Sequence, residues 1–171
     1  MPAPAFAIKA DRDQLVVDQL TAAFAGAIIS HERITDTLVI TVAKLAIHDV
    51  LKHCKEHLDL NFITTLCGMH YPERKALGLV IHLHSMRHGH RIRLKTETPM
   101  KDPMFPTFTD LWPAANWMER EAFDFFGLHF TGHPNLKRIL NMEDFPAFPM
   151  RKDYPLEDQT REDKDDSYFG R

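Results

Sequence analysis

The residues best suited to chemistry lie in a histidine-rich stretch near the middle of the chain. His82 and His84 alternate along one run of residues, and His88 and His90 follow at a turn. Two imidazoles at positions i and i+2 share one face of a strand and could chelate a metal ion. Arginines interleaved with these histidines would repel a cation. A solvated or partner-facing surface is therefore the preferred interpretation, and a small histidine-dependent metal enzyme is the rival.

The other candidate groups favour structural roles. Cys54 and Cys67 are isolated from each other among apolar neighbours, whereas iron–sulfur and structural zinc sites take about four ligands. We expect both thiols to be buried in a reducing compartment. His133 follows Gly132, and we expect backbone hydrogen bonds to fix its ring. The chain has no Gly-x-Gly-x-x-Gly, P-loop or nucleophile elbow. These patterns predict no catalytic, cofactor-binding or metal-binding residues.

Composition limits the class of protein further. The 171 residues are 44% hydrophobic and 26% charged, which fits one compact domain with an extension. A net charge of -3 provides no basic field for nucleic acid. The opening Met-Pro-Ala-Pro lacks the features of a secretory signal, and the apolar stretch over 20–29 is shorter than the ~20 residues of a membrane span. We expect a cytoplasmic protein that does not cross a membrane by itself.

Periodicity predicts the elements that position these groups. Apolar spacing indicates helices over 13–27 and 46–58, and β-branched runs indicate strands over 38–42 and 61–67. Alternation over 77–84 and 91–95 around a glycine turn predicts a hairpin with one apolar face and one polar face. The fold class is α+β, a two-layer sandwich of a mostly antiparallel sheet with helices.

The last part of the chain has a different character. Prolines break the pattern after position 99, helical spacing resumes over 112–126, and Gly127 is suited to end that helix. We divide the chain into a core domain, 1–127, and an extended C-terminal docking tail, 128–171. The tail is rich in prolines and large apolar residues and has no sustained period. We expect it to lie in grooves on its own domain or on a partner, with the acidic run 157–166 as a solvated face.

The helix before the tail carries two unusual residues. On a helical wheel Glu119 falls within the apolar sector, where a carboxylate must be hydrogen-bonded or paired. We expect it to hold backbone amides or a nearby basic group. Trp117 falls on the opposite side, among Arg120, Glu121 and Asp124. An exposed tryptophan of this kind anchors interfaces, although the chain's own tail could also cover it.

Three sequence blocks carry a resemblance to a known family. They read Trp112-Pro-Ala-Ala-Asn-Trp117-Met-Glu119-Arg120-Glu121-Ala-Phe-Asp124-Phe-Phe-Gly127, then Phe130-Thr-Gly132-His133-Pro134-Asn-Leu-Lys137-Arg138-Ile-Leu140, then Arg151-Lys152-Asp153-Tyr154-Pro155. In this order they resemble the signature of the NuoC-type subunit, the 30 kDa subunit family, of respiratory complex I. Lys137 stands where the family usually has arginine. A second Gly-His-Pro of many members is replaced here by residues 145–149.

The resemblance implies a scaffold subunit in the peripheral arm of a proton-translocating NADH–quinone oxidoreductase, on the cytoplasmic side of the inner (cell) membrane. It implies contacts with subunits of the D, B and I types. FMN, iron–sulfur clusters and quinone would reside in partner subunits, and this chain would bind no redox cofactor. The signature residues would be structural or would form the partner interface: Trp112, Trp117, Glu119, Arg120, Glu121, Asp124, Gly127, Gly132, His133, Pro134, Lys137, Arg138, Arg151, Lys152, Asp153, Tyr154 and Pro155.

An alternative stays open within the same superfamily. The chain could be the equivalent subunit of a ferredoxin- or F420-linked quinone or phenazine oxidoreductase, or of a membrane-bound hydrogenase. Only the accompanying subunits separate these possibilities.

Overall fold

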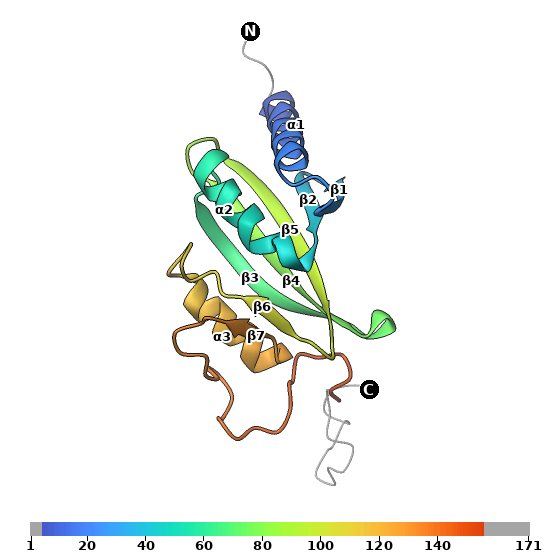
Figure 1. The fold of residues 1–171 in the computed structure, drawn as a ribbon, viewed down its shortest axis with the longest axis vertical. Coiled ribbons are helices and arrows are strands. Elements are labelled where there is room, and N and C mark those ends of the chain that lie inside the picture. The colour runs from blue at the N-terminus through green and yellow to red at the C-terminus, as the bar shows by residue number, and fades with distance from the viewer. Residues whose placement is uncertain (1–4, 156–171) are drawn as a thin grey trace, which may run out of the picture.

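The structure, a computed structural model, describes residues 5–155, with side chains from residue 10 onward (Figure 1). Three α-helices and seven strands follow one another along this range. The helices are α1 (Ala5–Ala23), α2 (Ile47–His57) and α3 (Ala115–Phe126). The strands are β1 (Ile28–Ile34), β2 (Thr37–Val42), β3 (Phe62–Tyr71), β4 (Ala76–Ser85), β5 (His90–Pro99), β6 (Met104–Pro106) and β7 (His129–Thr131).

Five strands form one mixed sheet in the order β1-β2-β5-β4-β3. Three of its pairings are antiparallel, and only β2 and β5 run parallel. The expectation of a mostly antiparallel sheet is confirmed. The predicted hairpin is β4–β5, in which Leu83 pairs with Ile92 and Ser85 pairs with His90. Gly89 supplies the positive φ of +59° that its turn requires.

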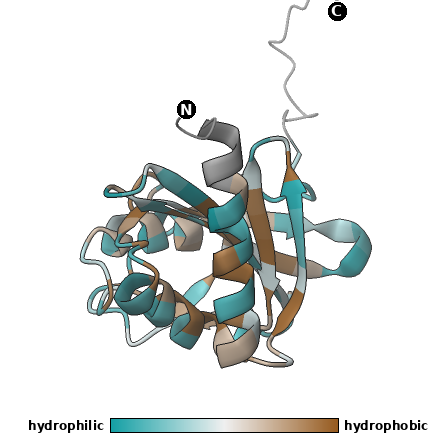
Figure 2. Cartoon of the chain, turned by 90° about the horizontal axis from the view of Figure 1, so that it is seen from above, coloured by the Kyte–Doolittle hydropathy of each residue, from teal (hydrophilic) through white to brown (hydrophobic). Residues whose placement is uncertain are grey.

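The core lies between one face of this sheet and the helices. Leu77, Leu79, Ile81 and Leu83 alternate along β4, and each is at most 1% exposed. They belong to one apolar cluster with buried residues of all three helices. The bands of apolar and polar residues on α1 in Figure 2 reflect a helix that buries only one side. The two-layer α+β class predicted from the sequence is therefore confirmed.

Some expected boundaries are wrong for identifiable reasons. The first helix ends at Ala23 instead of residue 27, and the chain turns at Gly26, where φ is +86°. Strand β1 was not predicted, because as an edge strand it is mostly exposed and shows no alternation. Strand β3 continues through Gly68, where the sequence suggested an end. A Cβ atom there would lie 2.5 Å from the ring of Phe126, so glycine permits this close packing.

The described part of the tail packs against its own domain. Strand β7 pairs in parallel with β6 from the proline-rich connector, and Leu128 and Phe130 are buried in the core. Residues 132–155 then loop around α3 (Figure 1). A deletion after Gly127 would remove core side chains, so the truncated domain is not expected to keep its stability. Additional contact with a partner stays a prediction, and the acidic run 157–166 lies outside the described residues.

Candidate functional site

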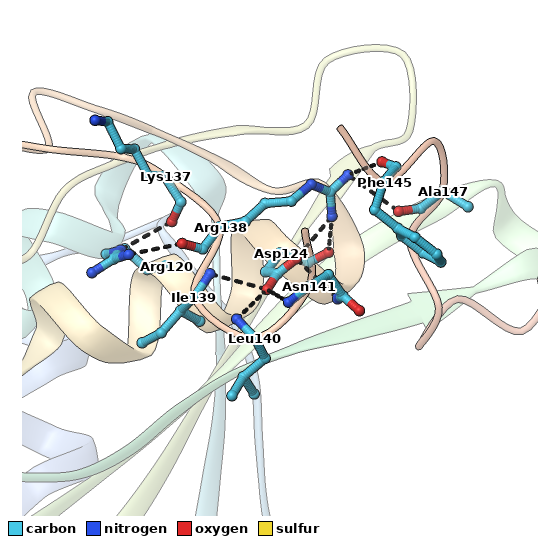
Figure 3. Close-up of polar contacts among 9 residues, drawn as sticks. All are labelled: Arg120, Asp124, Lys137, Arg138, Ile139, Leu140, Asn141, Phe145 and Ala147. Atoms are coloured by element: carbon cyan, nitrogen blue, oxygen red, sulfur yellow. Dashed lines mark hydrogen bonds and ion pairs between the residues drawn. The ribbon is translucent and has the colours of Figure 1, made fainter. Parts of the chain in front are cut away.

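Asp124 is the centre of a hydrogen-bond network that holds the tail on α3. Its side chain is fully buried and accepts the backbone N–H groups of Ile139, Leu140 and Asn141 at 2.8–3.1 Å. The side-chain amide of Asn141 donates to the other oxygen at 3.0 Å, as Arg138 does at 2.8 Å. Figure 3 shows these donors converging on the one carboxylate. A single helix residue therefore fixes four consecutive tail residues.

Arg138 extends the network to a later part of the tail. Its guanidinium donates to the carbonyl oxygens of Asp124, Phe145 and Ala147 at 2.7–3.2 Å (Figure 3). It also lies over the rings of Phe145 and Phe148, at 5.9 and 5.2 Å from their centroids. Five-donor arginine suits such a site because several acceptors can be served by one rigid fork. The Phe-Pro-rich stretch in which this chain departs from the family pattern thus packs on Arg138.

The charge of Asp124 is strongly stabilised. Burial by itself raises the pKa of this carboxyl, but the hydrogen bonds from Asn141, Arg138 and Leu140 outweigh burial and hold the pKa well below its usual value. The sequence analysis had placed Asp124 on a charged outer side of the helix. That placement is wrong, because the tail covers this side and supplies donors that a helical wheel cannot show.

Arg120 joins the exposed Trp117 to the same tail. Its Nε and Nη2 atoms donate to the carbonyl oxygens of Lys137 and Arg138 at 2.9 and 2.7 Å. Its guanidinium also lies 5.4 Å from the centroid of the Trp117 ring. Trp117 is 59% exposed, as the sequence predicts, and Glu121 beside it is exposed too. Lys137 contributes only its backbone here, so its difference from the family's arginine leaves this contact intact.

The third signature block closes the tail against the end of α3. Arg151 donates to the carbonyl oxygen of Phe126 at 2.7 Å and lies over the ring of Phe148. Gly127 caps α3 with a φ of +71°, as predicted, and an added Cβ would lie 2.6 Å from the guanidinium of Arg151. Glycine is therefore needed both for the backbone conformation and for the close approach.

His70, which the sequence analysis did not single out, holds the far end of the described tail. This buried residue on β3 accepts the backbone N–H of Lys152 at 3.0 Å, and its ring lies 3.7 Å from a carboxylate oxygen of Asp153. Tyr154 lies beside the Phe145 ring, and Pro155 is exposed. An alternating strand pattern could have suggested that His70 faces inward, but its partner is 82 residues away.

Glu119 anchors a different segment, the one before α3. The carboxylate is fully buried, and its two oxygens accept the backbone N–H of Phe108 and the hydroxyl of Thr107, each at 2.7 Å. The predicted role of tying down a backbone amide is confirmed. Burial raises the pKa of Glu119 to about 7, although these two hydrogen bonds act in the opposite direction.

This raised pKa predicts a pH-dependent stability. Because the folded protein holds the Glu119 proton more tightly than the unfolded chain, stability is greatest below the ordinary pKa of 4.5 and falls as pH rises through about 7. The loss is roughly 3 kcal/mol over this range. Glu119→Gln should remove that slope, measured as the free energy of unfolding in urea between pH 5 and 8. Glu121→Gln, on the exposed side of α3, is the control. An unchanged slope in Glu119→Gln would contradict this assignment.

Histidine and tryptophan side chains of the signature are also engaged in structure. His133 accepts the backbone N–H of Asn135 at 3.0 Å, and its other nitrogen lies 3.2 Å from the carbonyl oxygen of Asn116. The expectation that backbone contacts fix this ring is confirmed. Gly132 has a φ of +86° at the end of β7, and Pro134 is exposed beside it. Trp112 is buried and donates its indole N–H to the carbonyl oxygen of Asn61 at 2.8 Å.

The groups that could do chemistry do not assemble. Nowhere between residues 10 and 155 do three or more His, Cys, Asp or Glu side chains gather in a way that could hold a metal ion. His82 and His84 instead accept hydrogen bonds from Arg93 and Arg91, both at 3.0 Å. Cys54 is buried, and burial raises the pKa of its thiol to about 12, so it stays protonated.

This arrangement of helix and tail has a counterpart among known proteins. Residues 40–160 match the family described as the 30 kDa subunit of the respiratory-chain NADH dehydrogenase. The chain belongs to this family. The matched range includes the sheet from β2 onward, α3 and the tail that the Asp124 network holds. No helix among the described residues has the length and apolar character needed to cross a bilayer.

Curated relatives of this family, all C-type subunits of NADH-quinone oxidoreductases, resemble the chain over most of its length. The relative from Citrifermentans bemidjiense is 38% identical over 90% of this chain and 95% of that protein. The relative from Roseiflexus castenholzii is 40% identical over 82% of this chain and 83% of its own length. The relative from Methylobacterium sp. is 38% identical over 84% and 67%, respectively.

Solved structures share the fold. A trypsin-resistant fragment of Nqo5 superposes with a TM-score of 0.62 and 30% identity, covering 73% of this chain and 99% of that fragment. A chain of the membrane-bound sulfane sulfur reductase, an archaeal respiratory membrane complex, superposes with a TM-score of 0.73 and 26% identity, covering 84% and 85%. The fold thus occurs in more than one kind of respiratory complex.

Proposed function

We propose that the chain is a scaffold subunit in the peripheral arm of a proton-translocating NADH–quinone oxidoreductase, on the cytoplasmic side of the cell membrane. In this role it supports electron transfer from NADH to quinone and binds no redox cofactor. FMN, iron–sulfur clusters and quinone belong to partner subunits, of which the D, B and I types are the neighbours. Membership in the 30 kDa subunit family and the relatives named as C-type subunits support this assignment.

One structural observation carries the scaffold role. The charged signature side chains of Asp124, Arg120, Arg138 and Arg151 bind the chain's own backbone, so their chemistry is used to shape a surface. That surface consists of the outer side of α3 and the tail wound over it; we call it the α3–tail surface. Its exposed large apolar residues are Trp117, Leu140, Met142 and Met150, each 58–70% exposed. Apolar side chains held on a rigid frame suit burial by a partner.

The experiment is purification of the tagged chain from membranes of its own host. We expect D-, B- and I-type subunits to be recovered with it in equal amounts. Deleting the gene should abolish NADH–quinone reductase activity in membranes, and the intact gene should restore it. Recovery of the chain without companions, or substrate turnover by the purified chain alone, would contradict the proposal.

The same purification tests a second candidate. Likeness to a chain of the membrane-bound sulfane sulfur reductase favours an equivalent subunit in a related complex, such as a ferredoxin- or F420-linked oxidoreductase or a membrane-bound hydrogenase. Flavoprotein subunits that oxidise NADH should be present in the purified complex if the first proposal holds. Their replacement by a hydrogenase or a ferredoxin- or F420-binding subunit would support the second.

A further inference from the structure

The sheet face that no described helix covers carries a line of positive charge. Arg91, Arg93 and Lys95 alternate along β5 and point away from the core, since Ile92 and Leu94 between them are fully buried on the helix side. Alternate residues of a strand are about 7 Å apart on one face. Because β5 is the middle strand of the five, these three residues, the β5 cationic stripe, run along the centre of the open face.

Histidines on the neighbouring strand orient two of these cations. The Nε of Arg91 donates to Nδ1 of His84, and the Nε of Arg93 donates to Nε2 of His82, each at 3.0 Å. The two pairs are directly opposite each other in the β4–β5 register. Burial and the nearby arginines lower the pKa of His82, which keeps this acceptor neutral. A neutral imidazole fixes the guanidinium without compensating its charge, whereas a carboxylate would do both.

The charge of the stripe is not neutralised within the described chain. No carboxylate between residues 10 and 155 forms an ion pair with Arg91, Arg93 or Lys95. Of the acids on the same face, Glu97 pairs with Arg74 at 3.1 Å, and Glu32 lies on β1, opposite Val39 in the register. The whole chain has a net charge of -3, so the stripe is a local feature rather than a result of basic composition.

We propose that the β5 cationic stripe is a docking site for an acidic segment of another subunit of the same complex, an inference that rests on the proposed function. Each arginine uses Nε for its histidine, which leaves the two terminal nitrogens for a carboxylate. Carboxylates on alternate residues of an extended segment repeat at the same ~7 Å spacing as the stripe. Charge complementarity therefore identifies the occupant as an acidic protein segment.

Neighbouring side chains favour a protein over a lipid surface. Val39 and Val80 lie beside the stripe in the register, opposite Arg93 and Lys95, and they are only 1% and 6% exposed. Attachment to a membrane surface combines cations with apolar side chains that insert between lipids. The apolar residues next to the stripe are already buried, so recognition here depends on charge.

The test is a double charge reversal, Arg91→Glu with Arg93→Glu, compared with Lys52→Glu and Lys101→Glu, which change the net charge equally from exposed positions off the stripe. Tagged chains are incubated with host membranes from the gene-deletion strain, and binding is followed as a function of salt concentration. The stripe variant should bind roughly tenfold or more weakly at low ionic strength, with a flatter salt dependence. The control variant should bind as the wild type does.

Three outcomes separate the possibilities. Equal binding by the stripe variant and the wild type would overturn the inference while leaving the proposed function standing. Failure of the wild-type chain itself to associate with complex subunits would overturn the proposed function. Wild-type binding to protein-free vesicles of 30% phosphatidylglycerol, lost in the stripe variant, would assign the stripe to lipid and overturn the protein occupant. Thermal melting of both variants confirms that each is folded before binding is compared.

Discussion

Asp124→Ala should lower the free energy of unfolding by roughly 3–5 kcal/mol, because it removes one partner of a buried ion pair. Arg138 would keep its charge in a site where its side chain is only 9% exposed. The backbone N–H groups of Ile139, Leu140 and Asn141 would lose their common acceptor. Urea unfolding at pH 7 measures the loss. Limited proteolysis should then cut the tail between 137 and 151, which is protected in the wild type.

The control is Asp110→Ala, which removes a half-exposed carboxylate paired with His48 at 2.9 Å. This change should cost less than about 1 kcal/mol, as exposed ion pairs do. Asp124 also makes a pH prediction. Because its pKa is lowered in the folded state, its stabilisation is complete above the ordinary value of 3.8 and is lost as pH falls through the folded-state pKa. Equal losses for the Asp124 and Asp110 variants would show that the network does not hold the tail.

Trp117→Ala should prevent assembly of the complex while leaving the fold intact. The ring is 59% exposed, so its removal costs the free chain little packing. Arg120 lies over the ring and is itself fixed by two tail carbonyls, so the indole is held in place before any partner arrives. Preorganised aromatic anchors at the centre of an interface contribute about 2–4 kcal/mol each, or roughly 30- to 1000-fold in affinity. Purification of the tagged variant from membranes measures the recovery of companion subunits.

Phe62→Ala provides a matched control for this experiment. Phe62 is an aromatic residue of similar exposure, 51%, at the start of strand β3. Its removal should leave the recovery of companion subunits near the wild-type level, and both variants should melt at nearly the wild-type temperature. Normal recovery with Trp117→Ala would show that the α3–tail surface docks without this residue. A large drop in its melting temperature would instead assign the ring a role in the chain's own fold.

Much of the fold could be predicted because its signals are local. The β4–β5 hairpin follows from alternation around a glycine turn, and α2 from apolar spacing along one face. The wheel for α3 correctly separated the buried Glu119 from the exposed Trp117. Strand β1 gave no such signal, because an edge strand with few buried residues needs no alternation. Gly68 was misread as an end for a related reason, since its partner Phe126 lies on a distant helix.

The sequence by itself determined the family, through three signature blocks, and the α+β class, through the periods of its strands and helices. Only the tertiary structure decided what the signature charges do. A wheel of α3 placed Asp124 among solvated groups, yet the folded tail buries it under five donors from residues 138–141. The physical reason is that irregular backbone has no period, so its hydrogen-bond partners are set by long-range packing and cannot be read from spacing along the chain.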